Sequence, residues 1–528
     1  MDVKQITFAE TGYFSETVIG YLNGAENIAP FVPYTNAEEG MRKAMEAYTA
    51  HAVDRPALVK RLQESYRDLQ IIDAVDASIH SLSDPNTYCI VTAHQLNIFT
   101  GPLYVMYKAL AAVRHAALAK KHFPDRNFVP VFWLGSEDHD FAEINHFHVY
   151  GQTITWEDEQ GGACGQYVCN GKSMIDVLDK LDAMLDGSPE AKEISTLFRD
   201  AYLHSADLGL ATHKILHHLF GPYGMLIVDG DDAVYKKACA DIISDELFER
   251  SSERIVQETI AAFPYPPQAT PREINLFYLQ KHIRERIVYT DGAFHVLNTG
   301  IVFSEDAMRK EMEEHPERFS PNVILRPLFQ QRAIPAVMFI GGGGELAYWL
   351  LLKDLFARHN TVYPAVQLRD SFLFVDEKVQ IKMNKLQLKA TDFFGDADTI
   401  IRNWLEKQFG DALSLDAEKE KISAVFANIT EKMRAIDASM ESAVLAEQKN
   451  LLNSMDKLEA KLRKAEKTKQ ETAVNQIRAI HDKLFPGAGL QERHDNVIPL
   501  YLKFGRRLFD ILLEAPANDE PAFVIIQE

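Results

Sequence analysis

The chain has 528 residues, more than one compact core usually holds, so its length favours two or three domains. Hydrophobic residues make up 46% of the sequence, as expected of a folded protein. The 56 basic and 76 acidic side chains give a formal net charge of −20, which opposes general attraction to nucleic acids or anionic membranes. Composition therefore predicts a protein that binds neither.

The amino-terminal sequence and the cysteines indicate the cellular compartment of the protein. "MDVKQITFAETGYF" has no basic segment followed by an apolar one, and the most apolar later stretch, residues 337–352, is interrupted by glycines and Glu345. The cysteines are too sparse for a disulfide scaffold and form no Cys-x-x-Cys pair. They are Cys89, Cys164, Cys169 and Cys239. We expect reduced thiols in a soluble cytoplasmic protein.

The first 385 residues predict an α/β fold. Residues 1–85 contain an Ala-, Glu-, Arg- and Leu-rich region typical of helices that pack on a core. In residues 86–385, β-rich runs alternate with helical patterns; the runs are "TYCIVT", "FVPVFWLG", "GMLIVDG", "FHVLNTG" and "AVMFIGG". This alternation favours a largely parallel sheet covered by helices. Acidic, Gly-rich or Pro-rich sequence near residues 155–205 and 261–319 indicates insertions.

Residues 386–486 predict a helical coiled-coil domain. No Gly or Pro occurs between Asp411 and Phe485, and one set of positions recurs at alternating steps of four and three. The set is Val444, Gln448, Leu451, Met455, Leu458, Leu462 and Ala465. An antiparallel hairpin within one chain and a coiled coil that dimerises both fit this seam. Residues 487–528 are expected to form a helix and a short strand that return to the core.

The first candidate site segment, "TAHQLNIFTGPLYVMYK", predicts a strand, a loop and a helix. Free N–H groups at the start of a helix favour an anion, and Pro102 suits the first helical turn. His94, Gln95, Gly101 and Lys108 are therefore candidates for binding anionic substrate groups. In the alternative interpretation, His94 is a loop residue and Lys108 a solvated helix residue.

The second segment, "VFWLGSEDHDFAEINHF", places Glu137, Asp138, His139 and Asp140 after a strand. Carboxylates and an imidazole at such a place can bind a hydroxylated or cationic substrate, transfer protons, or hold a divalent ion. Glu137 and His139 share one face if the strand continues through them. The alternative is an exposed acidic loop in which Asp140 caps the next helix. No cysteine has the spacing that would support zinc.

The third segment, "AVMFIGGGGELAYW", predicts a strand, a glycine turn and a helix. Glycines allow a nucleotide to approach the backbone, although the segment lacks the features of a P-loop or a dinucleotide fingerprint. A tight structural turn is the alternative, with the two aromatic residues in the core. The candidates for binding nucleotide or cysteine are Gly341, Gly342, Gly343, Gly344, Glu345, Tyr348 and Trp349.

Together these segments resemble the bacillithiol-biosynthesis cysteine ligase family. The resemblance is carried, in the expected order over almost the whole chain, by "HQLNIFTGPLYVMYK", "PVFWLGSEDHDFAEIN", "INLFY", "EEHPERFSPNVILRPL", "IPAVMFIGGGGELAYW" and "LQERHDNVIPLYLKFG". It implies a Rossmann-like core related to class I aminoacyl-tRNA synthetases and a coiled coil that forms a homodimer. It also implies ATP with Mg²⁺ as cofactor and L-cysteine and glucosaminyl-malate as substrates. No zinc is expected, because the sequence has no cysteine set like the one with which cysteine-activating synthetases bind it. Arg326, in "EEHPERFSPNVILRPL", is a further candidate for binding substrate.

The likeness to synthetases has departures. "TGPLYVMYK" resembles the loop in which Gly-Pro-Leu precedes His-Ile-Gly-His, but Tyr104 and Tyr107 stand in place of the two histidines. "GGGGELAYW" resembles the Gly-Gly-Gly-x-Asp-Leu segment of cysteine-activating synthetases, with Glu345 in the acidic place. "KMNK", residues 382–385, imitates the Lys-Met-Ser-Lys-Ser loop, although its surroundings predict a helix.

The leading interpretation is an ATP-linked ligase that joins the cysteine carboxyl to the sugar amine of glucosaminyl-malate. The carboxylate needs activation because oxide is a prohibitive leaving group, and transfer of an adenylyl or phosphoryl group provides a better one. Both routes stay open, as does a different activated cysteine donor. The competing interpretation is a nucleotide-binding interaction protein whose synthetase-like core has lost catalysis.

Overall fold

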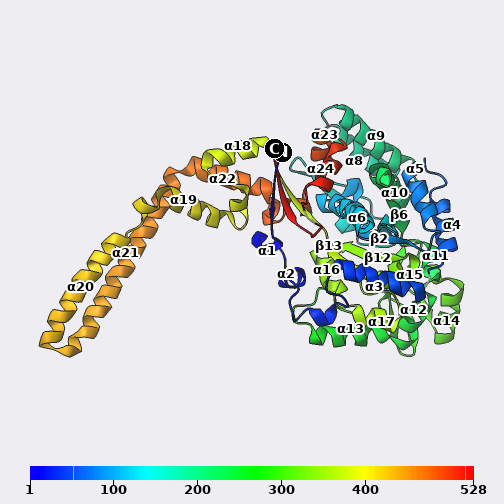
Figure 1. Cartoon of the computed structure of the whole chain (residues 1–528), viewed down its shortest axis with the longest axis horizontal. Helices are drawn as coiled ribbons and strands as arrows, with labels where there is room; N and C mark the ends of the chain where they lie inside the picture. The colour runs from blue at the N-terminus through cyan, green and yellow to red at the C-terminus, as the bar shows by residue number, and fades with distance from the viewer. Residues whose placement is uncertain (51–52, 518) are drawn as a thin grey trace. The chain divides into compact units, whose positions relative to one another are not determined.

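The computed structural model describes residues 1–50, 53–517 and 519–528 (Figure 1). They form two compact units, one of residues 4–372 and 492–524 and a smaller one of residues 1–3, 373–491 and 525–528. Sequence analysis placed the corresponding division between residues 385 and 386. Over the described part of the chain, no helix combines the length and the apolar character needed to cross a membrane.

The larger unit is built on a five-stranded sheet of order β13-β12-β2-β3-β6, in which every neighbouring pair is parallel. The predicted α/β fold with a parallel sheet is therefore confirmed. The strands are buried because helices cover them, and they are accordingly rich in apolar residues. Their bounds are β2 Thr87–Gln95, β3 Asn127–Gly135, β6 Leu226–Asp229, β12 Ala336–Gly341 and β13 Ala365–Leu368.

The order of the strands reverses between β2 and β12. From β2 the chain proceeds outward through β3 to β6, and then returns to β12 on the other side of β2 and continues to β13. Thr92 of β2 is paired with Ile340 of β12 and with Phe132 of β3. In open parallel sheets, ligands bind outside the carboxyl ends of the strands at such a reversal. The ends of β2 and β12 are therefore the expected binding crevice.

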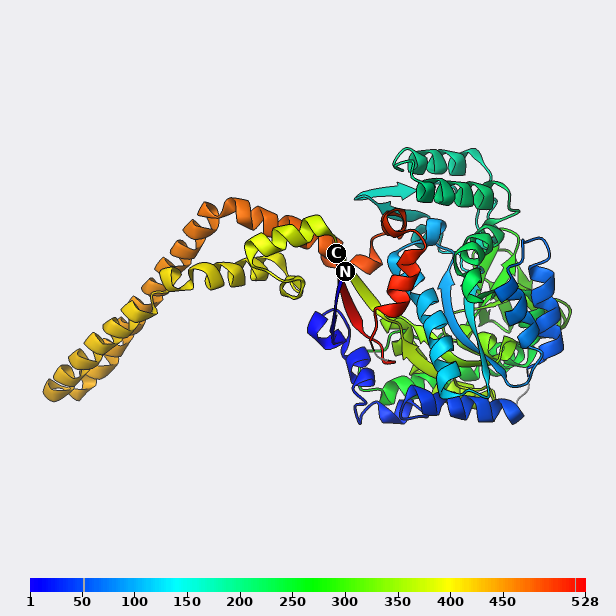
Figure 2. The same ribbon diagram turned by 45° about the horizontal axis from the view of Figure 1, so that its top comes forward.

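Helices pack around this sheet. The long helix α6 (Leu103–His122) contacts β2, β3 and β12, and α3 (Ala37–Ala50) contacts β12 and β13 (Figure 2). The other helices before β6 are α1 Phe8–Thr11, α2 Glu16–Leu22, α4 Arg55–Ser65, α5 Asp73–Ser81, α7 Phe141–Ile144, α8 Lys172–Asp182, α9 Pro189–Leu203 and α10 Leu208–Phe220. A short hairpin joins β4 (His146–Val149) to β5 (Gln152–Thr155).

After β6 the larger unit contains further helices. They are α11 Ala233–Lys237, α12 Ala240–Ser244, α13 Ser251–Ala262, α14 Glu305–Glu314, α15 Arg326–Ala333, α16 Gly343–Trp349, α17 Lys353–Arg358, α23 Ile498–Phe504 and α24 Arg507–Glu514. Among them, α16 follows β12 directly and contacts α2. Helix α16, which follows strand β12 at the switch point, therefore packs against the amino-terminal helix α2.

A second sheet is antiparallel and has the order β10-β9-β8-β7-β11. The expectation that "FHVLNTG" joins the parallel sheet is wrong, because it forms β9 here. Two-residue turns connect β7 to β8 and β8 to β9, with left-handed backbone at His282, Asp291 and Gly292, and such short links permit only antiparallel pairing. The strands are β7 Leu276–Gln280, β8 Ile283–Thr290, β9 Ala293–Val296, β10 Val302–Phe303 and β11 Phe319–Pro321.

The smaller unit is mainly helical. A further three-stranded sheet has the order β1-β15-β14, and each of its strands has residues in both units: β1 Asp2–Ile6, β14 Ser371–Val375 and β15 Phe523–Gln527. The expected carboxy-terminal strand is therefore present. The helices are α18 Glu377–Leu386, α19 Ala397–Leu413, α20 Asp416–Ile436, α21 Glu441–Lys469 and α22 Glu471–Leu484. Residues 382–385 lie within α18, as their surroundings predicted.

Helices α20 and α21 form an antiparallel hairpin (Figure 1). Lys419 near the start of α20 lies 2.7 Å from Asp456 and 2.8 Å from Glu459, while Arg434 near its end pairs with Glu441. The intramolecular hairpin is therefore the arrangement of this tract.

The hairpin buries only part of the predicted seam. Val444 is 8% exposed, and Gln448 and Met455 are partly buried, whereas Leu451, Leu458 and Leu462 are 41%, 50% and 40% exposed. Because α20 covers α21 from one side only, a stripe of three leucines stays open to solvent.

Candidate functional site

The loop between β2 and α6 has an unusual backbone. Phe99, Thr100 and Gly101 have φ angles of 50°, 70° and 64°, in the left-handed region. A Cβ on Gly101 would lie 2.5 Å from Cβ of Asn97, so glycine is required by both the backbone and its neighbour. The predicted order of strand, loop and helix is confirmed, and Gly101 has a structural reason independent of any ligand.

Asn496, from the carboxy-terminal part of the larger unit, holds this loop. Its Nδ2 donates to the carbonyl oxygens of Phe99 at 2.8 Å and Gly101 at 2.7 Å, and the N–H of Leu103 donates to the carbonyl oxygen of Asp495 at 2.8 Å. Since left-handed conformations of non-glycine residues cost energy, they need such support from the surrounding structure. Sequence analysis assigned no role to Asn496.

Lys108 and Glu345 form a buried ion pair at the switch point. Lys108 Nζ donates to Glu345 Oε2 at 2.6 Å and to the carbonyl oxygen of Ala93, and Gly342 N–H donates to the same Glu345 oxygen at 2.8 Å. Lys108 is 1% exposed, so the alternative of a solvated lysine is wrong. Burial raises the pKa of Glu345, but the Lys108 ammonium and the Gly342 N–H outweigh it, and the pKa is lowered overall. The carboxylate therefore balances the lysine charge.

His94 lies in β2, which rules out the loop alternative. Its Nδ1 is 2.9 Å from Asn97 Nδ2 and its Nε2 is 3.1 Å from Tyr104 Oη. Burial, with the nearby Lys108 charge, lowers the pKa of His94 to about 3. His94 is thus neutral at ordinary pH and offers no positive charge to an anion.

Two arginines lie on the β12 side of the switch point. Arg369, which follows β13, forms a two-pronged pair with Glu492 at 2.9 and 2.7 Å, and its guanidinium lies 5.5 Å from the ring centre of Tyr104. Its Nε is buried and has no hydrogen-bond partner among the described residues. Arg326 donates to Tyr348 Oη at 3.3 Å. The glycine-turn segment, which contains Tyr348, therefore meets the segment that contains Arg326. Arg369 and Glu492 were not among the predicted site residues.

The glycine turn is shaped by α2. Gly342 is the N-cap of α16, and none of the four glycines is among the described residues with left-handed φ. A Cβ on Gly343 would lie 3.2 Å from Val18 and 3.7 Å from Phe14, whereas one on Gly344 would lie 3.9 Å from Gln268. The atoms closest to Gly343 therefore belong to the protein itself, to the side chains of Val18 and Phe14.

Trp349 lies in the hydrophobic core, as the alternative interpretation of the third segment stated. Its side chain is fully buried and stacks on Phe339, with ring centres 4.5 Å apart. Tyr348 is also buried, but its hydroxyl reaches Arg326 as described above. Trp349 consequently supports the core beneath the turn and offers no surface to a ligand.

The four candidate residues of the second segment, from Glu137 to Asp140, lie in different surroundings. β3 ends at Gly135, so Glu137 and His139 do not share a strand face. Glu137 is buried 3.1 Å from Lys236, and burial raises its pKa. Asp140 accepts the N–H of Glu143 at 3.3 Å and caps α7, as the capping alternative stated.

Asp138 connects the second segment to the first. Gln95 Nε2 donates to Asp138 Oδ2 at 2.6 Å, and the N–H groups of His139 and Asp140 donate to Oδ1 at 2.7 and 3.2 Å. Burial alone would raise the pKa of Asp138, but the neighbouring His139 ring, the Arg284 charge, the Gln95 amide and the Asp140 N–H hold it well below its ordinary value. Asp138 is therefore an ionised carboxylate at the carboxyl end of the sheet.

His139 is held by a residue that sequence analysis missed. Arg284, on β8 of the antiparallel sheet, lies with Nη1 2.7 Å from His139 Nδ1. Among the residues that the structure describes, no group of three or more His, Cys, Asp or Glu side chains is placed to hold a metal ion. The second sheet thus contributes directly to the site at the ends of the parallel strands.

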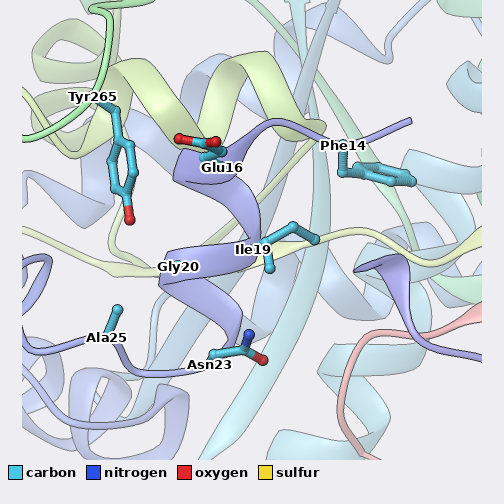
Figure 3. Close-up of a pocket in the computed structure, with 7 residues that line it drawn as sticks. All are labelled: Phe14, Glu16, Ile19, Gly20, Asn23, Ala25 and Tyr265. Atoms are coloured by element: carbon cyan, nitrogen blue, oxygen red, sulfur yellow. The ribbon is translucent and has the colours of Figure 1, made fainter. Parts of the chain in front are cut away.

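A separate pocket of about 330 Å³ lies at α2 (Figure 3). It is lined by Phe14, Glu16, Ile19, Gly20, Asn23, Ala25 and Tyr265. Figure 3 shows Ile19 projecting from helix α2, Asn23 just after its end, and Tyr265 reaching in from another segment. None of the predicted site residues lines this pocket, so it is distinct from the candidate site at the ends of β2 and β12.

Comparison with known proteins gives a consistent result over the whole chain. Residues 1–370 match the model of the bacillithiol biosynthesis BshC N-terminal Rossmann-like domain, and residues 372–528 match its C-terminal coiled-coil domain. A relative from Cytophaga hutchinsonii, named "Putative cysteine ligase BshC", is 37% identical over 94% of this chain and 93% of its own. A protein of the same name from Flavobacterium johnsoniae is 36% identical over 100% of both chains.

Among solved structures, Mycobacterium tuberculosis methionyl-tRNA synthetase in complex with methionyl-adenylate is 11% identical and covers 81% of this chain and 91% of its own. Its TM-score of 0.22 is too low to carry an argument about this fold. The assignment therefore rests on the two domain models and on the full-length relatives. By these matches, the chain belongs to the bacillithiol biosynthesis BshC family.

Proposed function

We propose that the protein is a ligase that adds L-cysteine to glucosaminyl-malate by forming an amide, in the last step of bacillithiol biosynthesis. The names of its full-length relatives support a cysteine ligase. The structural observation that carries the proposal is the meeting of three segments at the switch point. Gln95 contacts Asp138 across β2 and β3, and Lys108 contacts Glu345 across α6 and α16.

ATP with Mg²⁺ is the proposed source of activation. When bound, it supplies the adenylyl or phosphoryl group that turns the cysteine carboxylate into an acyl donor. The residues at the glycine turn fit a phosphate, because the buried Nε of Arg369 lacks a partner among the described residues and a Cβ on Gly342 would lie 3.9 Å from it. We propose that Arg369 and the turn from Gly341 to Glu345 hold this group.

Asp138 is the proposed contact for a substrate nitrogen. An ionised carboxylate fixed by three N–H donors attracts an ammonium or an amine, and both substrates carry one. We propose that His139 and Tyr104 bind substrate oxygens beside it. Each of them has a ring nitrogen or hydroxyl that is only partly engaged by protein contacts.

The test is to incubate purified protein with L-cysteine, glucosaminyl-malate, ATP and Mg²⁺ and to identify the amide by mass spectrometry. Product should require all four components. Asp138→Asn should reduce its formation by at least about a hundredfold with unchanged circular dichroism. Nucleotide binding without any product would contradict the proposal and support the alternative of a non-catalytic interaction protein.

We also propose that the protein is a homodimer joined through the α20–α21 hairpin. Leu451, Leu458 and Leu462 form an exposed apolar stripe on α21, at the spacing of a coiled-coil seam. The hairpin covers Val444 of the same seam and leaves these three leucines exposed, so the stripe is available to a second copy of the same helix pair.

A further inference from the structure

We propose that Arg284 is a positioning residue that fixes the tautomer of His139, so that His139 presents an N–H from Nε2 to the substrate and does not accept a proton. The choice of substrate rests on the proposed function. The tautomer itself rests only on the geometry around the imidazole.

The contact between Arg284 and His139 determines which ring nitrogen carries hydrogen. Arg284 Nη1 lies 2.7 Å from His139 Nδ1. A guanidinium has five N–H donors and no acceptor, so the imidazole nitrogen facing it must accept. A neutral imidazole that accepts at Nδ1 carries its hydrogen on Nε2.

Arg284 cannot easily turn away from this position. Its side chain is 6% exposed, its Nε donates to Ser320 Oγ at 3.0 Å, and its Nη2 donates to the carbonyl oxygen of Pro321 at 3.2 Å. The guanidinium also lies 4.1 Å from the ring centre of Phe277. Because every one of its nitrogens has an acceptor and its plane rests on an aromatic ring, the donor to His139 is preorganised.

The surroundings of His139 leave only one side of the ring open. Asp138 Oδ1 lies 3.6 Å from His139 Nδ1, beyond hydrogen-bond distance and farther than the guanidinium. The His139 ring packs beside Phe277, with ring centres 5.4 Å apart, and 45% of its side chain is exposed. Nε2 has no hydrogen-bond partner among the described residues, so its N–H is free to meet a ligand.

This arrangement changes the role expected of His139. A general base needs a free lone pair, but the lone pair on Nδ1 is occupied by Arg284 and Nε2 already carries hydrogen. An imidazole Nε2–H is instead suited to donate to a carbonyl, carboxylate or phosphate oxygen. The proton that the substrate amine loses is accordingly taken up by another group.

The first experiment reads the tautomer directly. Full-length protein labelled with ¹⁵N-histidine is examined by long-range ¹H–¹⁵N correlation, and His139 is assigned by its loss in His139→Gln. We expect the Nε2–H pattern in the wild type and a mixture of tautomers in Arg284→Met. Arg286→Met, on the same strand, is the control, because the Arg286 side chain makes no hydrogen bond or ion pair among the described residues, and it should leave the pattern unchanged.

The wild-type spectrum alone can overturn the proposal, even if Arg284→Met fails to fold. An Nδ1–H pattern or a doubly protonated ring at neutral pH would do so, and so would a pattern that Arg284→Met leaves unaltered. None of these measurements requires turnover. The tautomer can therefore be established if the protein makes no product, and the two failures are distinguishable.

The second experiment separates a donor from a base. The amide nitrogen of glutamine reaches about as far as Nε2 of histidine, so His139→Gln should keep product formation within about tenfold of the wild type. His139→Ala removes the donor and should cost at least about a hundredfold, the scale of losing one preorganised donor. Equal losses in both variants would indicate a base and contradict the proposed donor role.

Discussion

Lys108 Nζ donates to Glu345 Oε2 over 2.6 Å and so joins α6 to α16 across the point where the order of the parallel strands reverses. Gly342 N–H donates to the same oxygen, which ties the pair to the glycine turn. The two charges neutralise each other within the protein. A substrate anion at this place therefore meets a fixed pair of opposite charges and hydrogen-bond donors, and not a free lysine.

Replacing Glu345 should lower the free energy of unfolding more than replacing Lys108. Glu345→Gln leaves the buried Lys108 ammonium without a counter-charge and should lower the free energy of unfolding by about 3 kcal/mol. Lys108→Met replaces the ammonium by an apolar group of similar length, while Glu345 keeps the Gly342 N–H and is 24% exposed. We expect this variant to lose only about 1 kcal/mol. Urea unfolding measures both, and equal losses would contradict the pairing.

Asp229 should make stability depend on pH. It lies at the end of β6, where Ser136 Oγ and the N–H of Asp231 donate to its Oδ1, and burial raises its pKa to about 7 from an ordinary 3.8. Between these values the folded chain holds a proton that the unfolded chain has released. The contribution to stability is therefore fully present below about pH 4 and is lost as the pH rises through 7.

Asp229→Asn isolates this effect, because an amide oxygen accepts the same two hydrogen bonds without ionising. The variant should equal the wild type in stability near pH 4 and exceed it by about 2 kcal/mol at pH 8, a value below the full shift since the carboxyl keeps some exposure. Urea midpoints at the two pH values provide the check. A difference between the two proteins that does not change with pH would show that Asp229 does not titrate in this range.

The parallel sheet and the position of the candidate site could be predicted from the sequence. Apolar β-rich runs such as those containing Val91 and Phe339 are bounded by turn residues, and the ends of parallel strands meet at one edge of a sheet. That rule brings His94, Asp138 and Gly342 to the same edge of the sheet. The fold prediction, which rested on these local patterns, is confirmed, whereas the functional roles of the site residues stay predictions.

The supporting residues could not be predicted because their partners are remote. Arg284 is 145 positions from His139, Glu492 is 123 from Arg369, and Asn496 is 397 from Phe99. No periodicity in the sequence records such contacts. The heptad pattern had a similar limit, since it showed that α21 has an apolar face but not how much of that face α20 covers.

The glycine turn offers a test between packing and ligand binding. Gly343→Val should push its side chain against Val18, displace α2 and cost about 1–3 kcal/mol, because the nearest atom is already 3.2 Å from the position of a Cβ. Gly344→Ala meets only Gln268 at 3.9 Å and should be neutral or slightly stabilising, since alanine favours the helix. Thermal melting compares the two variants.

Binding measurements complete this comparison. If Gly343→Val melts normally but no longer binds nucleotide or cysteine in calorimetric titration, the turn faces a ligand at that position and the packing account is contradicted. A destabilised variant that retains binding would place α2, and no ligand, against Gly343.

The exposed leucines of α21 should control assembly without controlling folding. Replacing Leu451, Leu458 and Leu462 together by Glu puts charges where a second copy would pack, and we expect the dimer to become a monomer. The hairpin should survive because the three leucines are already exposed within it, as helical circular dichroism can verify. The control is Ala446→Glu, Asn453→Glu and Ala460→Glu, which adds the same charge at exposed positions outside the stripe. Light scattering that gives the same mass for the wild type and the leucine variant would remove the stripe as a dimer contact, whereas a monomer only in the leucine variant assigns assembly to these three side chains.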